Sequence, residues 1–239
     1  MVEVRFVARA FHPPWKGVAD MAIYTVEKCF PWQGPLSDKA TRVCRMFGVT
    51  IDRLTDQAPT HTCRVEIRPG DIVYLTGPSG AGKSVLLREL ERCVPASDAV
   101  RLACIGLPQD RTVVDCFDGD VVTSLQTLSA VGLSDVFSML NRPCWLSDGQ
   151  KYRFRLARAL AAGKPFVFAD EFCSELDQIT AATVAFNVHR LAKHAGTTLV
   201  LASSRDDILM DLAPDVIVVK DFSGPAQVIY KTSRGERAP

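Results

Sequence analysis

The residues Gly77 to Ser84, GPSGAGKS, match the spacing G-x-x-x-x-G-K-[ST] and are suited to holding phosphate groups. Their glycines let successive backbone N–H groups turn inward and form an anion site. The helix that we expect next adds further N–H groups and a partial positive charge. Lys83 can reach the β- and γ-phosphates, and the Ser84 hydroxyl can ligate Mg²⁺. The stretch therefore predicts nucleotide binding, but kinases, GTPases and motor ATPases all share it.

Two consecutive carboxylates, Asp170 and Glu171, follow the apolar run PFVFA. An acidic residue at the end of a buried strand beside a phosphate loop can hold Mg²⁺ through water. The next carboxylate can polarise the attacking water, which makes Glu171 the predicted general base. Without the phosphate loop, the same pair would be interpreted as a surface charge pair at a strand end.

The elements that must position these residues alternate between apolar strands and helices from Cys63 onward. The predicted strands include CRVEI, IVYLT, RLACIGL, PFVFAD, TTLVLAS and DVIVVK. Helical patterns between them include VLLRELERCV, DGQKYRFRLARALAAG and SELDQITAATVAFNVHRLAKHAG. This alternation predicts an α/β fold with a mostly parallel sheet that is flanked by helices.

The N-terminal part lacks the regular alternation of strands and helices. VEVRFVARA and MAIYTVEKCF are predicted strands, and LSDKATRVCRMFG is a predicted helix with Ser37 as its cap. We expect residues 1–44 to form a small β-rich extension, with a hairpin laid on the main sheet as the preferred arrangement. Residues 45–222 are the expected nucleotide-binding domain, with a helical arm at about 110–160, and residues 223–239 a C-terminal strand and tail.

Composition limits the function further. The 239 residues carry a formal net charge of +1, so no bulk field would drive nucleic-acid or membrane binding. The eight cysteines lack C-x-x-C spacing and are predicted to be reduced thiols of a cytoplasmic protein. No segment reaches the roughly 18 apolar residues that span a bilayer, so a membrane role would need a partner chain.

Two further segments carry a family resemblance. LSDGQKYRFRLARAL, residues 146–160, resembles the signature segment of ATP-binding-cassette (ABC) ATPases, which begins L-S-G-G-Q and ends A-R-A-L. PFVFADEFCSELD, residues 165–177, resembles the Walker B strand, catalytic glutamate and D-loop of that family. The resemblance covers roughly residues 45–222. It implies a P-loop NTPase fold, ATP and Mg²⁺ as cofactors, and a dimer, homomeric or heteromeric, that sandwiches two ATP molecules.

The resemblance also implies roles for individual residues. Ser147 and Gly149 would contact the γ-phosphate of the opposite subunit, and Gln109 would be the Q-loop glutamine, with a surface loop residue as the weaker alternative. The implied catalytic set is Glu171, Lys83, Gln109 and Ser204, and the implied metal ligands are Ser84, Gln109 and Asp170. The implied nucleotide contacts are Gly77, Pro78, Ser79, Gly80, Ala81, Gly82, Lys83, Ser84, Val85, Ser147, Gly149, Gln150 and Asp177.

This sequence departs from the family pattern in several places. Asp148 stands where the signature usually has glycine, and a carboxylate there would repel phosphate unless it turns away or meets a cation. Ser204 stands at the switch histidine, so we expect slow hydrolysis, with Arg205 as an electrostatic substitute. Phe47 is the best candidate for stacking on adenine, and a core role for it is an equal alternative. The predicted helical arm is short.

The preferred function is an ABC-class ATPase that dimerises around Mg-ATP to drive or gate a non-transport partner. More narrowly, the chain resembles prokaryotic ABC ATPase modules that are otherwise fused to an acetyltransferase-like domain. The first alternative is the ATP-binding subunit of a membrane ABC transporter, which the family's base rates favour. The second is an ATP-sensing module with little turnover. Direct nucleic-acid binding is a weaker alternative because the net charge is near zero.

Overall fold

The computed structural model describes residues 22–29, 34, 36–50, 53 and 60–231. Their main sheet has six strands in the order β4-β5-β6-β3-β7-β8. The strands are β3 (Ile72–Thr76), β4 (Ala99–Arg101), β5 (Phe166–Ala169), β6 (Thr198–Ala202), β7 (Val216–Val219) and β8 (Gln227–Tyr230). Neighbouring strands are parallel except for β8, which is antiparallel to β7. The predicted α/β fold with a mostly parallel sheet is confirmed.

The central strands are buried on both faces, which explains their continuous apolar sequences. Every residue of β3, β5 and β6 is buried. Along β3, Ile72 and Tyr74 belong to one core cluster, whereas Val73 and Leu75 belong to the other. The first cluster includes residues of α7 (Gln178–Ala195), and the second includes residues of α3 (Lys83–Arg92). Side chains alternate between the two faces as the strand period requires.

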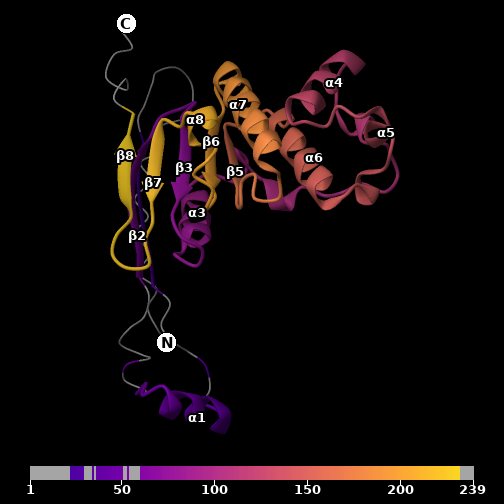
Figure 1. The fold of residues 1–239 in the computed structure, drawn as a ribbon. Helices are drawn as coiled ribbons and strands as arrows, with labels where there is room; N and C mark the ends of the chain where they lie inside the picture. The colour runs from indigo at the N-terminus through magenta and orange to yellow at the C-terminus, as the bar shows by residue number, and fades with distance from the viewer. Residues whose placement is uncertain (1–21, 30–33, 35, 51–52, 54–59, 232–239) are drawn as a thin grey trace, which may run out of the picture.

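The helical arm lies at one end of the sheet, beyond β5 and α7 (Figure 1). It comprises α4 (Val121–Ala130), α5 (Val136–Met139) and α6 (Asp148–Ala161), with the short 3₁₀ turns η2 (Val114–Cys116) and η3 (Pro143–Trp145). Leu128, Met139 and Phe154 of the arm belong to the same core cluster as Tyr74. The arm is therefore packed onto the sheet domain through a shared apolar core. The predicted strand RLACIGL is shorter than expected, because Leu102–Cys104 form a 3₁₀ turn, η1, after β4.

The N-terminal elements are β1 (Ala22–Cys29) and α1 (Asp38–Met46). The predicted cap of α1 is confirmed, since the Ser37 hydroxyl accepts a hydrogen bond of 3.3 Å from Ala40 N. β1 pairs antiparallel with β2 (Thr60–Ile67), from Ala22 opposite Ile67 to Cys29 opposite Thr60. This two-stranded sheet covers α3, because Val26 and Val65 share a core cluster with Leu86 and Leu90.

The expected strand VEVRFVARA and the tail beyond residue 231 lie outside the described residues. The expected domain boundary at residue 44 falls between the paired strands β1 and β2. Within the described part of the chain, no helix has both the length and the apolar character that crossing a membrane requires. The short helix α8 (Leu209–Leu212) connects the loop after β6 to β7.

Candidate nucleotide-binding site

The phosphate loop runs from the end of β3 at Thr76 to the start of α3 at Lys83, as the sequence predicts. Gly77 has φ +135°, and a Cβ added there would lie 2.0 Å from the carbonyl oxygen of Lys220. Gly82 has φ +95°, and a Cβ added there would lie 2.3 Å from Cε1 of His61, a side chain of β2. Both positions therefore require glycine, for the backbone conformation and for the close approach of neighbouring atoms.

The side chain of Lys83 folds back onto the start of the phosphate loop. Its Nζ donates hydrogen bonds of 2.8 Å to the carbonyl oxygens of Gly77 and Pro78. Burial lowers the pKa of Lys83, and the carboxylates of Asp170, Glu171 and Asp206 act in the opposite direction. The ammonium group is thus held at the mouth of the loop, where an arriving phosphate would meet it.

Ser84 and Asp170 meet beside this loop, although 86 residues separate them in sequence. The Ser84 hydroxyl donates a 2.9 Å hydrogen bond to Oδ1 of Asp170, which also accepts from Glu171 N at 3.1 Å. A hydroxyl and a carboxylate are hard oxygen ligands that suit Mg²⁺. The described residues contain no cluster of three His, Cys, Asp or Glu side chains that could hold a metal. This donor set fits Mg²⁺, because that ion keeps several waters and binds substrate phosphates.

Gln109 is exposed in the loop that follows η1. Among the described residues, no hydrogen bond joins its side chain to Ser84 or Asp170. The structure therefore brings Lys83, Ser84 and Asp170 together at the phosphate loop and leaves Gln109 outside their direct contacts. Its role as a metal ligand stays a prediction.

Glu171 begins a strained turn at the end of β5. Its φ is +51° and that of Cys173 is +59°, both in the left-handed region. Ser174 N donates to Glu171 O at 3.0 Å, and Phe172 N donates to Ala202 O of β6 at 2.8 Å. Non-glycine residues adopt this conformation only where their surroundings impose it. The turn presents the Glu171 side chain to solvent.

A cavity of about 280 Å³ adjoins the two carboxylates. Its lining includes three arginines and three carboxylates, namely Arg88, Arg101, Arg155, Asp170, Glu171 and Glu175. The positive and negative side chains balance in number. The cavity therefore provides space beside Glu171 but selects no charge of ligand.

The signature segment begins α6 in the arm. The Ser147 hydroxyl accepts from Gln150 N at 3.4 Å, and Gln150 Oε1 accepts from Ser147 N at 3.0 Å, which forms a capping box. Asp148 is 89% exposed, and its carboxylate lies 3.2 Å from the Lys151 ammonium. The Asp148 carboxylate, which stands where the family signature usually has glycine, thus turns outward and pairs with a cation. In the described part of the chain, no hydrogen bond joins Ser147 or Gly149 to the phosphate loop, although the middle of α6 approaches α3 where Tyr152 and Arg88 line one cavity.

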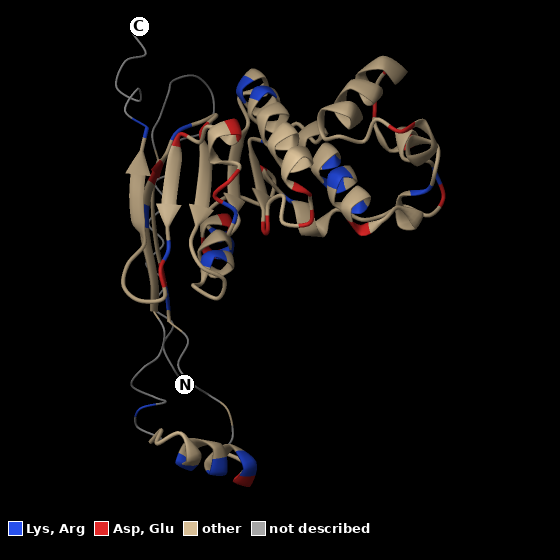
Figure 2. Cartoon of the chain, in the orientation of Figure 1, with Lys and Arg blue, Asp and Glu red and all other residues tan. Residues whose placement is uncertain are grey.

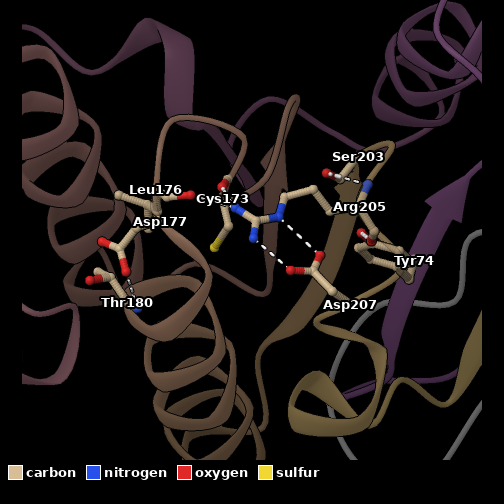
Figure 3. A network of polar contacts seen from close by, with 8 residues as sticks. All are labelled: Tyr74, Cys173, Leu176, Asp177, Thr180, Ser203, Arg205 and Asp207. Atoms are coloured by element: carbon tan, nitrogen blue, oxygen red, sulfur yellow. Dashed lines mark hydrogen bonds and ion pairs between the residues drawn. The ribbon is translucent and has the colours of Figure 1, made fainter.

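Ser204 is exposed in the loop after β6, and no hydrogen bond involves its side chain in the described part of the chain. The guanidinium of its neighbour Arg205 is bound to the Asp207 carboxylate and to the carbonyl oxygen of Cys173 (Figure 3). This geometry does not support the expectation that Arg205 substitutes for the switch histidine, because its guanidinium is engaged elsewhere.

Other functional candidates were missed at the sequence level. The Asp206 carboxylate accepts from Thr76 Oγ1 at 2.7 Å, which places a third carboxylate near Lys83. Phe222 lies beside the loop, with a ring atom 3.9 Å from the position of a Cβ at Gly80. No sequence pattern identifies either residue, since both reach the site from loops after other strands.

Phe47 is not brought to the phosphate loop. It is 77% exposed at the end of α1, and α1 lies apart from the sheet domain (Figure 1). No residue of α1 is buried, so Phe47 has no core role here either. Both expectations for Phe47 therefore lack support in this arrangement.

Basic residues recur along α6 (Figure 2). Arg153 donates to the carbonyl oxygen of Gly132 at 2.8 Å, and Arg155 donates to that of Ile105 at 3.2 Å. Arg158 donates to the carbonyl oxygen of Cys116. These side chains tie α6 to the rest of the arm and to the loop after η1, so they give no support to nucleic-acid binding.

Comparison with known proteins narrows the class. No family model matches the chain. The chain is 29% identical over 206 residues to the lipoprotein-releasing system ATP-binding protein LolD of Novosphingobium aromaticivorans, covering 68% of this chain and 86% of that one. It is 30% identical over 197 residues to the aliphatic sulfonates import ATP-binding protein SsuB 1 of Paracoccus denitrificans, and the match covers 75% of this chain and 78% of that one. It is 28% identical over 211 residues to the methionine import ATP-binding protein MetN of Corynebacterium efficiens, of which it spans only 57%.

Solved structures share the fold. A dimeric ATP-binding cassette in a post-hydrolysis state, bound to ADP and Pi, superposes with a TM-score of 0.57 at 19% identity, over 70% of this chain and 88% of that one. The parallel sheet, the phosphate loop and the Asp170 carboxylate at the end of β5 define a P-loop nucleotide-binding protein. Its sequence relatives narrow the class, and the chain belongs to the ATP-binding cassette (ABC) ATPase family.

All three sequence relatives are ATP-binding proteins of import or release systems. On sequence alone, the short predicted arm and Ser204 favour a non-transport partner. The relatives instead favour the transporter alternative.

Proposed function

We propose that this chain is the ATP-hydrolysing subunit of a membrane transporter and works as a dimer around Mg-ATP. The observation that carries the ATPase part is the contact between Ser84 and Asp170, 2.9 Å, beside the Lys83 loop and next to Glu171. The transporter part is supported by the relatives, whose names describe import and release systems.

The chain's own groups account for the chemistry. Backbone N–H groups of the phosphate loop and Lys83 bind the phosphates, while Ser84 and Asp170 would hold Mg²⁺. Mg²⁺ held there would neutralise negative charge on the phosphates. Glu171 accepts a proton from water, whose oxygen bonds to the γ-phosphorus as the bond to the bridging oxygen of ADP breaks. ADP and inorganic phosphate are the products.

A second cassette completes each site. Ser147 caps α6 and Gly149 lies in its first turn, and among the described residues no hydrogen bond joins either one to the phosphate loop. Their hydroxyl and backbone N–H, together with the positive end of α6, suit the γ-phosphate bound by another copy. The expected assembly is a two-fold dimer in which ATP joins the two chains.

The arm offers a surface for a membrane chain. It exposes apolar side chains between 60% and 85%, namely Val121, Val122, Val136, Phe137, Leu140 and Trp145. A cavity of about 340 Å³ lies between the loop after β4 and α6, lined in part by Val100, Ile105, Pro108 and Arg158. Exposed apolar groups of this kind mark protein interaction sites. The partner would supply the membrane spans and hold this chain at the cytoplasmic face.

A second candidate is an ATP-bound switch with slow turnover. It is favoured by the loop after β6, where Ser204 carries no charge and the Arg205 guanidinium is engaged by Asp207 and Cys173 O. A serine can hydrogen-bond a phosphate oxygen but cannot supply the positive charge of a histidine. Slow hydrolysis would lengthen the life of the ATP-bound dimer.

The ATPase proposal is tested by phosphate release with Mg-ATP, together with light scattering, on the wild type, Glu171→Gln and Glu175→Gln. Glu175 borders the same cavity and serves as the matched control. We expect Glu171→Gln to slow release by about 10²-fold or more and to accumulate as an ATP-bound dimer. Glu175→Gln should behave like the wild type. If all three proteins dimerise on ATP and none releases phosphate, the second candidate, an ATP-bound switch, is supported and the ATPase proposal is wrong.

The transporter proposal is tested by recovering membrane proteins that cross-link to the tagged chain in its host. Phe137→Asp, in the exposed apolar part of the arm, should reduce recovery of a multi-span chain. Met210→Asp, at a 90% exposed position of α8, is the control and should not. Equal recovery with both variants would contradict docking through the arm.

A further inference from the structure

Arg205 connects two loops of the site (Figure 3). Its Nε and Nη2 donate to the two carboxylate oxygens of Asp207, at 3.0 and 2.6 Å. Its Nη1 donates to the carbonyl oxygens of Cys173, at 3.0 Å, and Leu176, at 2.5 Å. The side chain thereby ties the loop after β6 to the segment between Glu171 and Asp177.

The backbone of Arg205 is fixed by two further hydrogen bonds. The Tyr74 hydroxyl, on the central strand β3, donates to the Arg205 carbonyl oxygen at 2.5 Å, and Arg205 N donates to Ser203 Oγ at 3.3 Å. The bidentate pairing with Asp207 raises the pKa of Arg205 and lowers that of Asp207. Arg205 therefore stays charged, and both its backbone and its guanidinium plane are held.

Cys173 is held from two sides. Its N–H donates to the Tyr152 hydroxyl at 3.0 Å, and its carbonyl accepts from Arg205. Tyr152 comes from α6, the helix that begins with the signature segment. Cys173 is fully buried and has φ +59°, so these bonds stabilise a conformation that is unfavourable for a non-glycine residue.

The segment that is held carries a predicted functional carboxylate at each end. Glu171, two residues before Cys173, has φ +51° and is the predicted base. Asp177 follows Leu176 directly and caps α7, accepting from Thr180 N at 3.0 Å. The contacts of Arg205 with Cys173 and Leu176 lie between these two ends.

We propose that Arg205 is a positioning residue that, with Tyr152, holds the turn from Glu171 to Asp177 in the geometry that hydrolysis requires. The inference rests on the proposed ATPase function. It also gives the loop after β6 a role that differs from direct contact with phosphate. A shift of about 1 Å in a catalytic group can cost about 10²-fold in rate, so loss of these bonds should affect turnover.

The test compares Arg205→Met with Arg190→Met, a variant of an exposed arginine on α7. Steady-state kinetics give kcat and KM for ATP, and fluorescence titration with a labelled ATP analogue gives Kd. We expect Arg205→Met to lower kcat by about 10- to 100-fold while Kd stays within about twofold. Arg190→Met should change neither. A merely structural role would weaken binding and turnover together.

Tyr152→Phe gives the second arm, because it removes the hydroxyl that accepts from Cys173 N. It should also lower kcat without changing Kd, and the double variant should lose less than the product of the two single losses, since both act on one turn. If Arg205→Met does not fold, Arg205→Lys is measured in its place and should still lower kcat, because a lysine cannot reproduce the planar fork.

The two failures are distinguishable. A wild type that dimerises on ATP without turnover overturns the proposed ATPase function, and this inference with it. Wild-type turnover with an unchanged kcat in Arg205→Met, or equal losses of kcat and affinity, overturns the positioning role alone.

Discussion

The close approach of His61 to the phosphate loop makes Gly82→Ala an informative substitution. A Cβ at position 82 would lie 2.3 Å from Cε1 and 2.4 Å from Nδ1 of the His61 ring. The ring is 8% exposed, so it has little room to move away. Because of this overlap, we expect the variant to lose stability even without nucleotide.

The expected loss has two parts. A non-glycine residue at φ +95° costs about 1–3 kcal/mol of conformational free energy. Forcing an added carbon into a filled space costs about 1–3 kcal/mol more. The free energy of unfolding should therefore fall by about 2–6 kcal/mol in Gly82→Ala.

Gly119→Ala is a matched control, because Gly119 has φ +100° and a Cβ there would meet nothing within 4 Å. Urea denaturation of both variants should place Gly82→Ala about 1–3 kcal/mol below Gly119→Ala. Replacing His61 by Ala removes the overlapping ring. The double variant should consequently lose about 1–3 kcal/mol less than the sum of the single losses.

Equal losses in Gly82→Ala and Gly119→Ala would refute the steric argument. So would additivity within about 0.5 kcal/mol in the cycle with His61→Ala, because sites that do not touch behave in this way. In either case, only the dihedral angle of residue 82 would explain its requirement for glycine.

Three other outcomes are expected. Burial, and secondarily Lys220, lower the pKa of His61 below its ordinary 6.5. Near and below that pH, the imidazole therefore binds more protons in the unfolded chain than in the folded chain. Stability should then fall as pH drops below about 6.5, and His61→Asn should flatten that slope in thermal denaturation at several pH values. Ser147→Ala should lower the stability of the nucleotide-free protein by about 1 kcal/mol in urea, since it removes the N-cap of α6. Ser84→Ala and Asp170→Asn should raise the Mg²⁺ concentration needed for half-maximal phosphate release, as a titration at fixed ATP would measure; an unchanged Mg²⁺ requirement in both would remove them from the metal site.

The strands and the phosphate loop could be predicted because their information is local. Runs such as IVYLT and TLVLA are continuous apolar strands, and the spacing of the glycines before Lys83 identifies the turn. The contact between Ser84 and Asp170 could be inferred only from the family pattern. In the structure it follows from the parallel order β5-β6-β3, which brings the end of β5 to the phosphate loop.

Tertiary contacts decided what the sequence could not indicate. The direction of Arg205 depends on the carbonyl groups of Cys173 and Leu176, which lie about 30 residues earlier in the chain. The pairing of β1 with β2 joins strands that the sequence separates by residues 30–59, so no local pattern marks it. The role of Phe47 stays a prediction, because none of the residues of the helix that precedes it is buried and no contact in the described part of the chain places it at the phosphate loop.

The pairing of β1 with β2 also makes the intervening stretch a replaceable insert. The chain leaves β1 at Cys29 and returns at its register partner Thr60, so both ends of the connection are fixed at neighbouring points of one ladder. Shortening the connection about sixfold would lower the entropy cost of closing it by about 1.5 kcal/mol. We therefore expect the β1–β2 ladder, and the packing of its side chains on α3, to persist when the connection between Cys29 and Thr60 is shortened.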